Sequence, residues 1–372
     1  MTYQRLGDYI REVNVRNREM KVTNLLGVNL SKQFFPSIAN IIGTDLSKYK
    51  IIEKGQFGCK FMSVGRDGIL PISLMQDDKP AIISSAYYVF EVKDQEVLLP
   101  EYLMMWLRRP EFDRQLWFYS GGDVRGGVNY DDFCEMPIII PSITRQREIV
   151  SEYETLTNRI RLNEQMIAKL EETAQALYRK MFVNGIDKEN LLEGWRRGRL
   201  SEIATITMGQ SPEGETYNLD GQGMIFYQGR TDFGRRFPAA RVYTTSPTRY
   251  AKEGDVLLSV RAPVGDLNVA SHDCCIGRGL ASLRSLHNCQ SYLFYQLQNL
   301  SNVFNVSDDE GTIFGSINKD DLFNIEIVVP ILQKMKMFEE QASVIDKQIG
   351  TKDKEINNLT ELQSLLLAKM GQ

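Results

Sequence analysis

Histidine is scarce in this sequence, and its cysteines form no recognisable framework. The 372 residues include two histidines and five cysteines, without a paired disulfide pattern or the usual two-residue gaps of paired zinc ligands. No apolar run approaches the roughly 18 residues of a membrane span, and the first residues lack a basic-then-apolar signal segment. We therefore expect a cytoplasmic protein with reduced thiols, no metal and no membrane segment.

The short motifs of common catalytic sites are also missing. The sequence contains no glycine-rich phosphate loop, dinucleotide-binding fingerprint, HExxH motif or GxSxG motif. It also lacks the Asn- or Asp-Pro-Pro-aromatic loop of an amino-methyltransferase. A zinc site at His272 with Cys274 and Cys275 would lack normal ligand spacing, and the acid-x-Lys triplet ending at Lys93 is of a kind that arises often by chance. No residue is assigned a catalytic role.

Positive charge is not in excess anywhere in bulk. The formal net charge is -4, which excludes a uniformly basic coat. Residues 1–141 hold 17 Lys plus Arg against 18 Asp plus Glu, and residues 195–330 hold 13 against 15. In the second segment, however, eleven of these cations are arginine. Arginine can bind guanine or phosphate with two parallel hydrogen bonds, so a local nucleic-acid groove remains open. Surface salt bridges are the alternative explanation.

The chain repeats itself. Segment 129–133 (NYDDF) recurs at 318–322 (NKDDL), and the offset of 189 holds without a gap to Lys180-Met181 and Lys369-Met370. Upstream of this segment, short similarities between the two halves continue at offsets of 190, 199 and 194, as expected for loops of different length on a shared framework. The sequence therefore predicts two related globular parts, each followed by a tail of fixed length.

A heptad pattern runs through both tails, which contain almost no glycine or proline. Apolar residues alternate at spacings of four and three, which predicts two long helices that pack together along one stripe, here called the seam. Asn163 and Lys352 fall near the middle of the seam, where buried polar groups can specify register. The main seam residues are Ile149, Tyr153, Leu156, Ile160, Ile167, Leu170, Leu177, Ile345, Ile349, Ile356, Leu359 and Leu366.

The globular parts contain shorter apolar runs, of the length of a strand. Strand-like segments include 81–83, 86–92, 256–260 and 326–329, and one helix is expected in each part, at Pro100–Trp117 and Cys289–Leu300. We expect an α+β (mixed α/β) fold with an internal pseudo-twofold repeat. Connectivity makes the two long helices antiparallel, because the first carries the chain away from one globular part and the second returns it.

Basic residues interleaved with aromatic residues suggest where nucleic acid could bind. Arg230, Arg235, Arg236 and Arg241 lie near Tyr227, Phe233 and Phe237, and two further arginines lie in glycine-containing turns. Residues 121–127 could cradle a phosphate with Arg125 as a clamp, or form a plain turn. The candidate DNA-binding residues are Lys32, Gln33, Lys60, Arg66, Arg125, Arg230, Arg235, Arg236, Arg261 and Arg278.

Two diverged globular parts, each followed by a helix of matched length, resemble the specificity subunit of type I restriction-modification enzymes over essentially the whole chain. Short segments that carry this resemblance include 28–29 (VN), 36–39 (PSIA), 146–149 (QREI) and 169–171 (KLE). The second tail departs from the pattern, since residues 335–338 read MKMF in place of QREI.

The resemblance implies a non-catalytic subunit of a DNA methyltransferase and endonuclease complex. Each target-recognition domain would read half of a bipartite, asymmetric double-stranded DNA target, and the coiled coil would set the gap and dock two modification subunits. S-adenosylmethionine is expected in those subunits and no cofactor in this chain; restriction subunits would join later. The expected parts are target-recognition domains at 1–141 and 195–330, coiled-coil helices at 142–183 and 331–372, and a linker at 184–194.

Two other hypotheses remain open. The chain could be a protein-protein scaffold without sequence-specific DNA binding, or an enzyme fused to its own specificity module. The missing methyl-transfer loop argues against the fused enzyme.

Overall fold

A computed structural model describes residues 2–37, 44–119, 128–187, 189–300 and 316–371. Arg125 lies outside the described residues. The chain divides into two compact units: unit 1 is Met1–Arg161 with Asn357–Gln372, and unit 2 is Leu162–Ile356. The division falls within both long helices, so α5 (Ile143–Phe182) and α9 (Leu332–Lys369) each contribute to both units.

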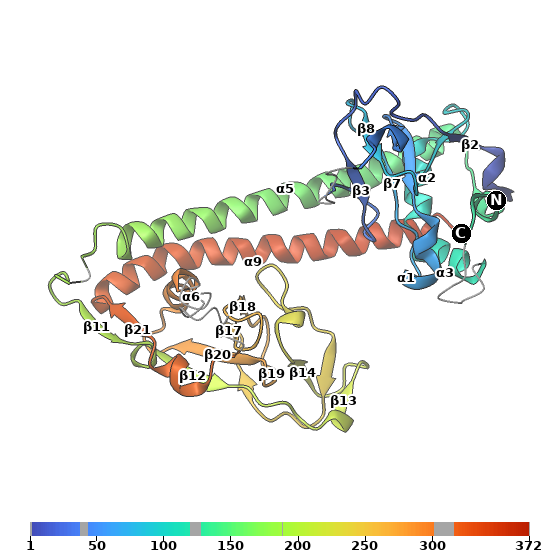
Figure 1. Ribbon diagram of the computed structural model, residues 1–372. Helices are drawn as coiled ribbons and strands as arrows, with labels where there is room; N and C mark the ends of the chain where they lie inside the picture. The colour runs from blue at the N-terminus through green and yellow to red at the C-terminus, as the bar shows by residue number, and fades with distance from the viewer. Residues whose placement is uncertain (1, 38–43, 120–127, 188, 301–315, 372) are drawn as a thin grey trace. The chain divides into compact units, whose positions relative to one another are not determined.

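Unit 1 is built on a four-stranded antiparallel sheet in the order β2-β9-β6-β7. Figure 1 labels two of its strands, β2 and β7. Its strands are β2 (Ile10–Val13), β9 (Tyr88–Val92), β6 (Gln56–Cys59) and β7 (Ile72–Leu74). Three antiparallel pairs join β1 (Tyr3–Arg5) with β10 (Pro137–Ile139), β3 (Leu26–Val28) with β4 (Phe34–Pro36), and β5 (Lys50–Ile52) with β8 (Ala81–Ile83). Its short helices are α1 (Val64–Asp67), α2 (Pro100–Leu107), α3 (Pro110–Tyr119) and α4 (Tyr130–Cys134).

Unit 2 also contains a four-stranded antiparallel sheet, in the order β12-β20-β17-β18. Its strands are β12 (Ala204–Met208), β20 (Leu280–Ser285), β17 (Val256–Ser259) and β18 (Leu267–Val269). A second sheet runs β13 (Tyr217–Asn218), β15 (Val242–Thr244), β14 (Met224–Tyr227), β19 (Cys274–Ile276) and β16 (Tyr250–Ala251). The described part of unit 2 also contains the pair β11 (Arg196–Arg199) with β21 (Glu326–Val329), and the helices α6 (Gln290–Asn299) and α8 (Lys319–Phe323).

The two units arrange their strands alike. Sheet β2-β9-β6-β7 matches β12-β20-β17-β18 in order and chain position, and the pair β1-β10 matches β11-β21. A parallel bridge from Leu25 to Ile82 puts β3 beside β8, as β14 lies parallel to β19. The repeated Asn-x-x-Asp forms a capping box at the start of both α4 and α8. In each box the Asn side chain accepts from the backbone amide of the Asp, and the Asp side chain accepts from the backbone amide of the Asn.

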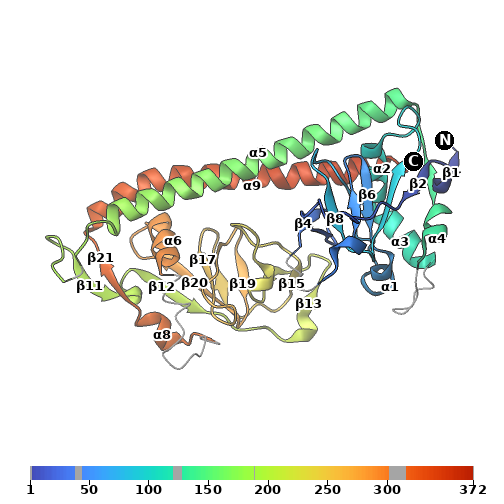
Figure 2. The ribbon, with the colours of Figure 1, turned by 45° about the horizontal axis from the view of Figure 1, so that its top comes forward.

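In unit 2, helix α6 lies between the four-stranded sheet and the long helices (Figure 2). Tyr292 of α6 belongs to one apolar cluster with Leu258 of β17 and Phe338 of α9, and its ring lies 5.0 Å from that of Phe182. In unit 1, α2 belongs to a comparable cluster with β9, the start of α5 and the end of α9. The long helices are thus part of each unit's hydrophobic core.

The expected seam residues of α5 and α9 are buried or half-buried. Ile167 and Ile349 are fully buried, and Ile149 is nearly so. The half-buried ones are Tyr153, Leu156, Ile160, Leu170, Leu177, Ile345, Ile356, Leu359 and Leu366. In unit 1 the Gln363 side chain donates to Thr157 Oγ1 at 2.7 Å, and in unit 2 the Tyr178 and Phe338 rings lie 5.7 Å apart. Residues near the end of α5 therefore lie beside residues near the start of α9, and residues nearer the start of α5 lie beside residues near the end of α9.

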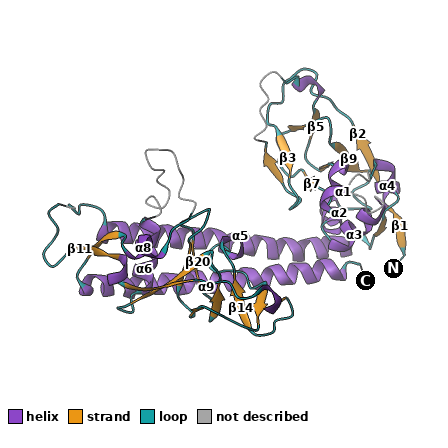
Figure 3. Cartoon of the chain, turned by 60° about the horizontal axis from the view of Figure 1, so that its bottom comes forward, coloured by secondary structure: helices purple, strands orange, loops and turns teal. Residues whose placement is uncertain are grey.

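The expectation of one helix at Pro100–Trp117 was wrong. The structure has two helices there, α2 and α3 (Figure 3), and the break lies before Pro110. Proline has no amide hydrogen to donate within a helix, and it disfavours helical geometry in the residue before it. The proline was visible in the sequence and marks the break.

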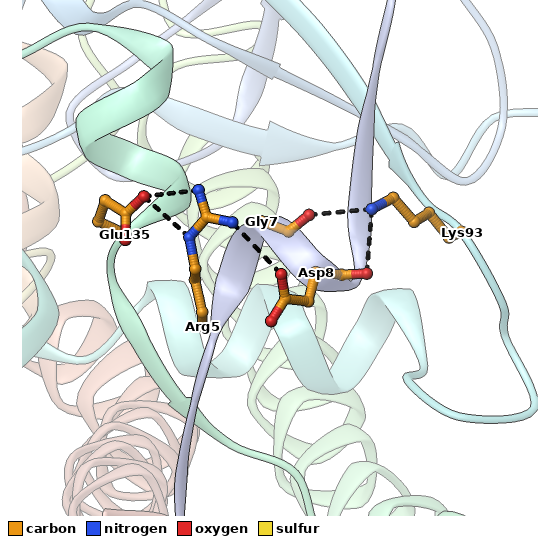
Figure 4. Close-up of polar contacts among 5 residues, drawn as sticks. All are labelled: Arg5, Gly7, Asp8, Lys93 and Glu135. Carbon is orange, nitrogen blue, oxygen red and sulfur yellow. Dashed lines mark hydrogen bonds and ion pairs between the residues drawn. The ribbon is translucent and has the colours of Figure 1, made fainter.

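Polar contacts fix the start of unit 1 (Figure 4). Arg5 at the end of β1 donates to Glu135 Oε1 from Nε at 2.8 Å, and to Asp8 Oδ1 from Nη1 at 3.3 Å. Lys93 Nζ donates to the carbonyl oxygens of Gly7 and Asp8, both at 3.0 Å. The turn between β1 and β2 is therefore held both to the residue after α4 and to the residue after β9.

Candidate nucleic-acid interface

Three turns of unit 2 meet at one end of its strands. They follow β14, β17 and β19, and we call them the unit-2 rim: residues 228–230, 260–266 and 277–279. Because β14 and β19 are parallel, their ends lie side by side, and the Gly277 amide donates to Tyr227 O at 2.8 Å. The Val260 amide donates to Gly279 O at 2.9 Å and so connects the third turn.

Close backbone contact explains the two glycines around Arg278. A Cβ on Gly277 would lie 3.0 Å from Gln228 Cα, and a Cβ on Gly279 would lie 2.8 Å from Gln228 O. Glycine is therefore needed for the turns to pack. Arg278 between them is exposed, and its amide donates to Ser211 Oγ at 3.3 Å.

Arg261 and Arg278 are exposed, and neither side chain forms an ion pair with another described residue. Arg249 is also exposed and without such a pair, and it lies nearby because its carbonyl accepts from the Ile276 amide at 2.9 Å. Sequence reasoning missed Arg249, since only the β16-β19 pairing brings it to the rim. Unpaired guanidinium groups can bind phosphate or guanine through two hydrogen bonds.

Arg230 also belongs to the rim, but it is paired. Its Nε donates to Asp266 Oδ2, and both side chains are about half exposed. Exposed ion pairs contribute little stability, typically about 0 to 1 kcal/mol. A phosphate group can therefore compete with Asp266 for Arg230.

The structure separates Arg235 and Arg236 from the rim. Arg236 has a side chain only 5% exposed, its Nη2 lies 2.6 Å from Asp346 Oδ1, and its guanidinium lies 3.4 Å from the centroid of the Phe294 ring. Arg235 Nη2 donates to Glu164 Oε1 at 2.8 Å. Burial and pairing thus place Arg236 in packing against α6 and α9, which disfavours the expected contact with DNA. Arg235 is tied to α5.

The expected DNA contact of Lys32 in unit 1 is disfavoured for the same reason. The Lys32 side chain is buried. Its Nζ donates to Asp113 Oδ2 at 2.7 Å and also to the carbonyl oxygen of Leu107. Burial lowers the pKa of Lys32, while the Asp113 carboxylate opposes that change. Asp113 also accepts from the Leu70 amide at 3.2 Å, so the cluster joins the β3-β4 turn to α3 and to the segment before β7.

The other candidates in unit 1 are more accessible but do not form one cationic cluster. Lys60 follows β6 and its Nζ lies 5.9 Å from the Tyr87 ring centroid. Arg66 is exposed and donates from Nε and Nη2 to the two carboxylate oxygens of Asp67, both at 2.8 Å. Gln33 is exposed, and its backbone amide donates to Asn29 Oδ1 at 2.9 Å.

A family of known proteins matches this chain. The model of the family described as the type I restriction modification DNA specificity domain matches residues 72–172 and 192–361, which is well over half of the sequence. The chain belongs to this family. Type I specificity subunits are non-catalytic members of restriction-modification systems, and their DNA specificity domains are target-recognition domains.

Individual specificity subunits are similar along most of their length. The chain is 25% identical over 345 residues to a protein named as the specificity subunit of the type I restriction enzyme MjaX from Methanocaldococcus jannaschii, covering 89% of this chain and 80% of that one. The type I restriction-modification S subunit of M. genitalium has the same fold, with a TM-score of 0.61, 14% identity, and coverage of 99% and 95%. The HsdS subunit of Thermoanaerobacter tengcongensis is 28% identical, with a TM-score of 0.40 and coverage of 99% and 96%.

The cysteines of this specificity subunit are free. Burial raises the pKa of Cys274 to about 12 and of Cys289 to about 11, so both thiols stay protonated at neutral pH and are poor nucleophiles. Among the described residues, no group of three or more His, Cys, Asp and Glu side chains could hold a metal ion. No helix in the described part of the chain is both long enough and apolar enough to cross a membrane.

Proposed function

We propose that this specificity subunit reads a bipartite, asymmetric double-stranded DNA target, with one half-site recognised by the globular part of each unit. The observation that carries the proposal is that the two units share a strand arrangement but present different residues at the ends of their strands. Similar frames with different side chains are what two unlike half-sites would require. We infer from the same arrangement that the chain contains an internal pseudo-twofold repeat.

The unit-2 rim supplies the chemistry for one half-site. Arg261 and Arg278, with Arg249 beside them, offer free guanidinium groups, and Arg230 can exchange its exposed partner for phosphate. A guanidinium can bind guanine O6 and N7 together, which distinguishes that base from the others. In unit 1, Lys60 and Gln33 are the accessible candidates, and Arg66 would first have to leave Asp67.

The long helices would then act as a spacer. Helix α5 has 40 residues and α9 has 38, so each is roughly 60 Å long at 1.5 Å per residue. The buried seam residues support a coiled coil in which the two helices brace each other. Such a rod would fix the number of unread base pairs between the half-sites.

Outward-facing apolar residues on the same helices support the docking of partner subunits. Five of them are about half exposed: Leu162, Met166, Val344, Leu362 and Leu365. Exposed apolar side chains along a helix favour contact with another protein. We propose that two modification subunits dock here and bring S-adenosylmethionine, that restriction subunits join later, and that this chain holds no cofactor.

Methylation mapping tests the proposal. The chain is expressed with its modification subunits in a host, and methylated bases are located by sequencing. We expect one two-part asymmetric motif with a constant gap, and a gel shift of the purified complex that depends on that motif. A shift that ignores sequence, or no shift, would favour the scaffold hypothesis instead.

A further inference from the structure

Unit 1 contains an open groove of about 680 Å³ between α2, α5 and β7. Its lining includes three carboxylates, from Asp77, Glu101 and Glu154, and one guanidinium, from Arg108. None of the three carboxylates forms a salt bridge with another residue in the described ranges. The groove is therefore open, acidic and unsuited to a phosphate group.

Unit 2 shows what such a groove can hold. The offsets of 190 and 189 align three groove residues with three residues of unit 2: Met104 with Phe294, Met105 with Tyr295, and Thr157 with Asp346. All three of these unit-2 residues surround the guanidinium of Arg236. It lies 3.4 Å from the Phe294 ring centroid, 5.5 Å from the Tyr295 ring centroid and 2.6 Å from Asp346 Oδ1.

The difference lies in the length of one loop. The β14-β15 loop, residues 228–241, carries Arg236 to this position, and Phe237 beside it lies against Gly350 of α9. The corresponding β3-β4 loop is only residues 29–33, and its lysine, Lys32, is already bound to Asp113. Unit 1 therefore keeps the three positions, with Met104, Met105 and Thr157 in place of the two rings and the carboxylate, and receives no arginine from its own hairpin.

We propose that this groove binds an arginine-bearing segment of a partner protein, with the guanidinium against Met104 and Met105 and within reach of the groove carboxylates. The acidic lining favours a cationic protein segment over DNA. Methionine side chains adapt to the shape of a bound group, so the exchange of Phe294 and Tyr295 for methionines is compatible with this role. The inference does not depend on DNA recognition and is tested without DNA.

The probe is a fluorescent peptide Phe-Gly-Arg-Arg-Phe-Pro, the sequence of residues 233–238. It is titrated against the full chain by fluorescence anisotropy. Replacing its second arginine by neutral citrulline is expected to weaken binding about tenfold, because a charge-assisted hydrogen bond is lost. Glu101→Gln with Glu154→Gln in the protein should have a comparable effect.

Thr157→Asp is the gain-of-function variant. It places a carboxylate at the position of Asp346 and should tighten binding of the arginine peptide about tenfold, whereas the matched neutral change Thr157→Asn should not. Circular dichroism establishes whether each variant is folded. If Thr157→Asp does not fold, the proposal is judged by whether Glu101→Gln with Glu154→Gln weakens binding of the arginine peptide. Equal binding of the arginine and citrulline peptides, or binding that no groove variant changes, would overturn the proposal.

Discussion

The hairpin loop of each unit is anchored by a buried ion pair, and the two units use different residues for it. Lys32 in the β3-β4 loop pairs with Asp113 of α3 at 2.7 Å, whereas Arg236 in the β14-β15 loop pairs with Asp346 of α9 at 2.6 Å. Each loop is thus anchored by a buried cation, one within its globular part and the other on a long helix. The difference teaches that a loop can be lengthened and re-anchored while the strand order stays the same.

The strand ends differ in another way. Unit 2 gathers Arg249, Arg261 and Arg278 around the rim, while unit 1 offers Lys60 beside Tyr87. Among the described candidates, three guanidinium groups without an ion pair in unit 2 compare with Lys60 and Gln33 in unit 1, so under the proposed function we expect unequal contributions to DNA binding from the two units. Unit 2 should supply more of the base discrimination.

The largest expected effect comes from separating the two units. One heptad inserted into both α5 and α9 keeps the seam in phase and lengthens the rod by about 10 Å. Under the spacer hypothesis, binding to the original target should fall to the non-specific level, typically about 10³-fold weaker or more. The preferred gap should grow by about three base pairs, at roughly 3.4 Å each.

Methylation mapping measures the new gap. Both half-sites should keep their sequences, because neither globular part is altered. An unchanged gap would rule out the spacer role, and a heptad inserted into α5 alone is the control that should disrupt the helix pair.

The two anchors can be broken one at a time. Arg236→Met leaves Asp346 without its cation, and Lys32→Met does the same to Asp113. Removing one partner of a buried ion pair costs about 3 kcal/mol or more. Hydrogen exchange should speed up in β14 and β15 for the first variant.

In Lys32→Met, faster exchange should instead be confined to β3 and β4. Adding Asp346→Asn to Arg236→Met should restore part of the lost protection, because it removes the unpaired charge. Uniform changes across both units would show that the anchors are not local.

A smaller effect should separate the half-sites. Arg278→Ala should weaken binding by about 1 to 3 kcal/mol if its contact is a bidentate base contact. Lys60→Ala should act on the other half-site. Competition with targets altered in one half at a time measures both. Arg235→Ala is the matched control, because Arg235 lies outside the unit-2 rim. Only its exposed ion pair with Glu164 is lost, so the expected effect is below about 1 kcal/mol.

Equal loss on every DNA sequence would instead assign Arg278 to phosphate. No loss would remove it from the interface.

The long helices could be predicted from the sequence because their signal is local and repeated. Spacings of three and four place seam residues such as Ile167 and Ile349 on one face, and both are fully buried. Short strands such as β8 and β21 were also predicted closely, since their apolar runs are bounded by polar residues. The break between α2 and α3 was overlooked, although Pro110 marks it.

The candidate site was harder to predict, because it depends on contacts between distant residues. Nothing in the sequence next to Arg236 indicates that Asp346, 110 positions away, neutralises it. Arg249 and Arg278 likewise come together only through strand pairing. Residue type was therefore a useful guide to chemistry, but not to which arginines remain free.

The smallest expected effect contrasts the polar seam residues of the two units. Asn163 in unit 2 is buried, and its Nδ2 has no hydrogen-bond partner among the described residues, whereas Gln363 in unit 1 donates to Thr157. A buried unpaired donor is costly, so Asn163→Leu should stabilise the chain by about 1 kcal/mol, while Gln363→Leu should be close to neutral. Denaturant unfolding measures both, and a destabilised Asn163→Leu would mean that the amide is satisfied in solution. If the leucine variant is more stable yet loses its fixed gap, Asn163 serves register at a cost in stability.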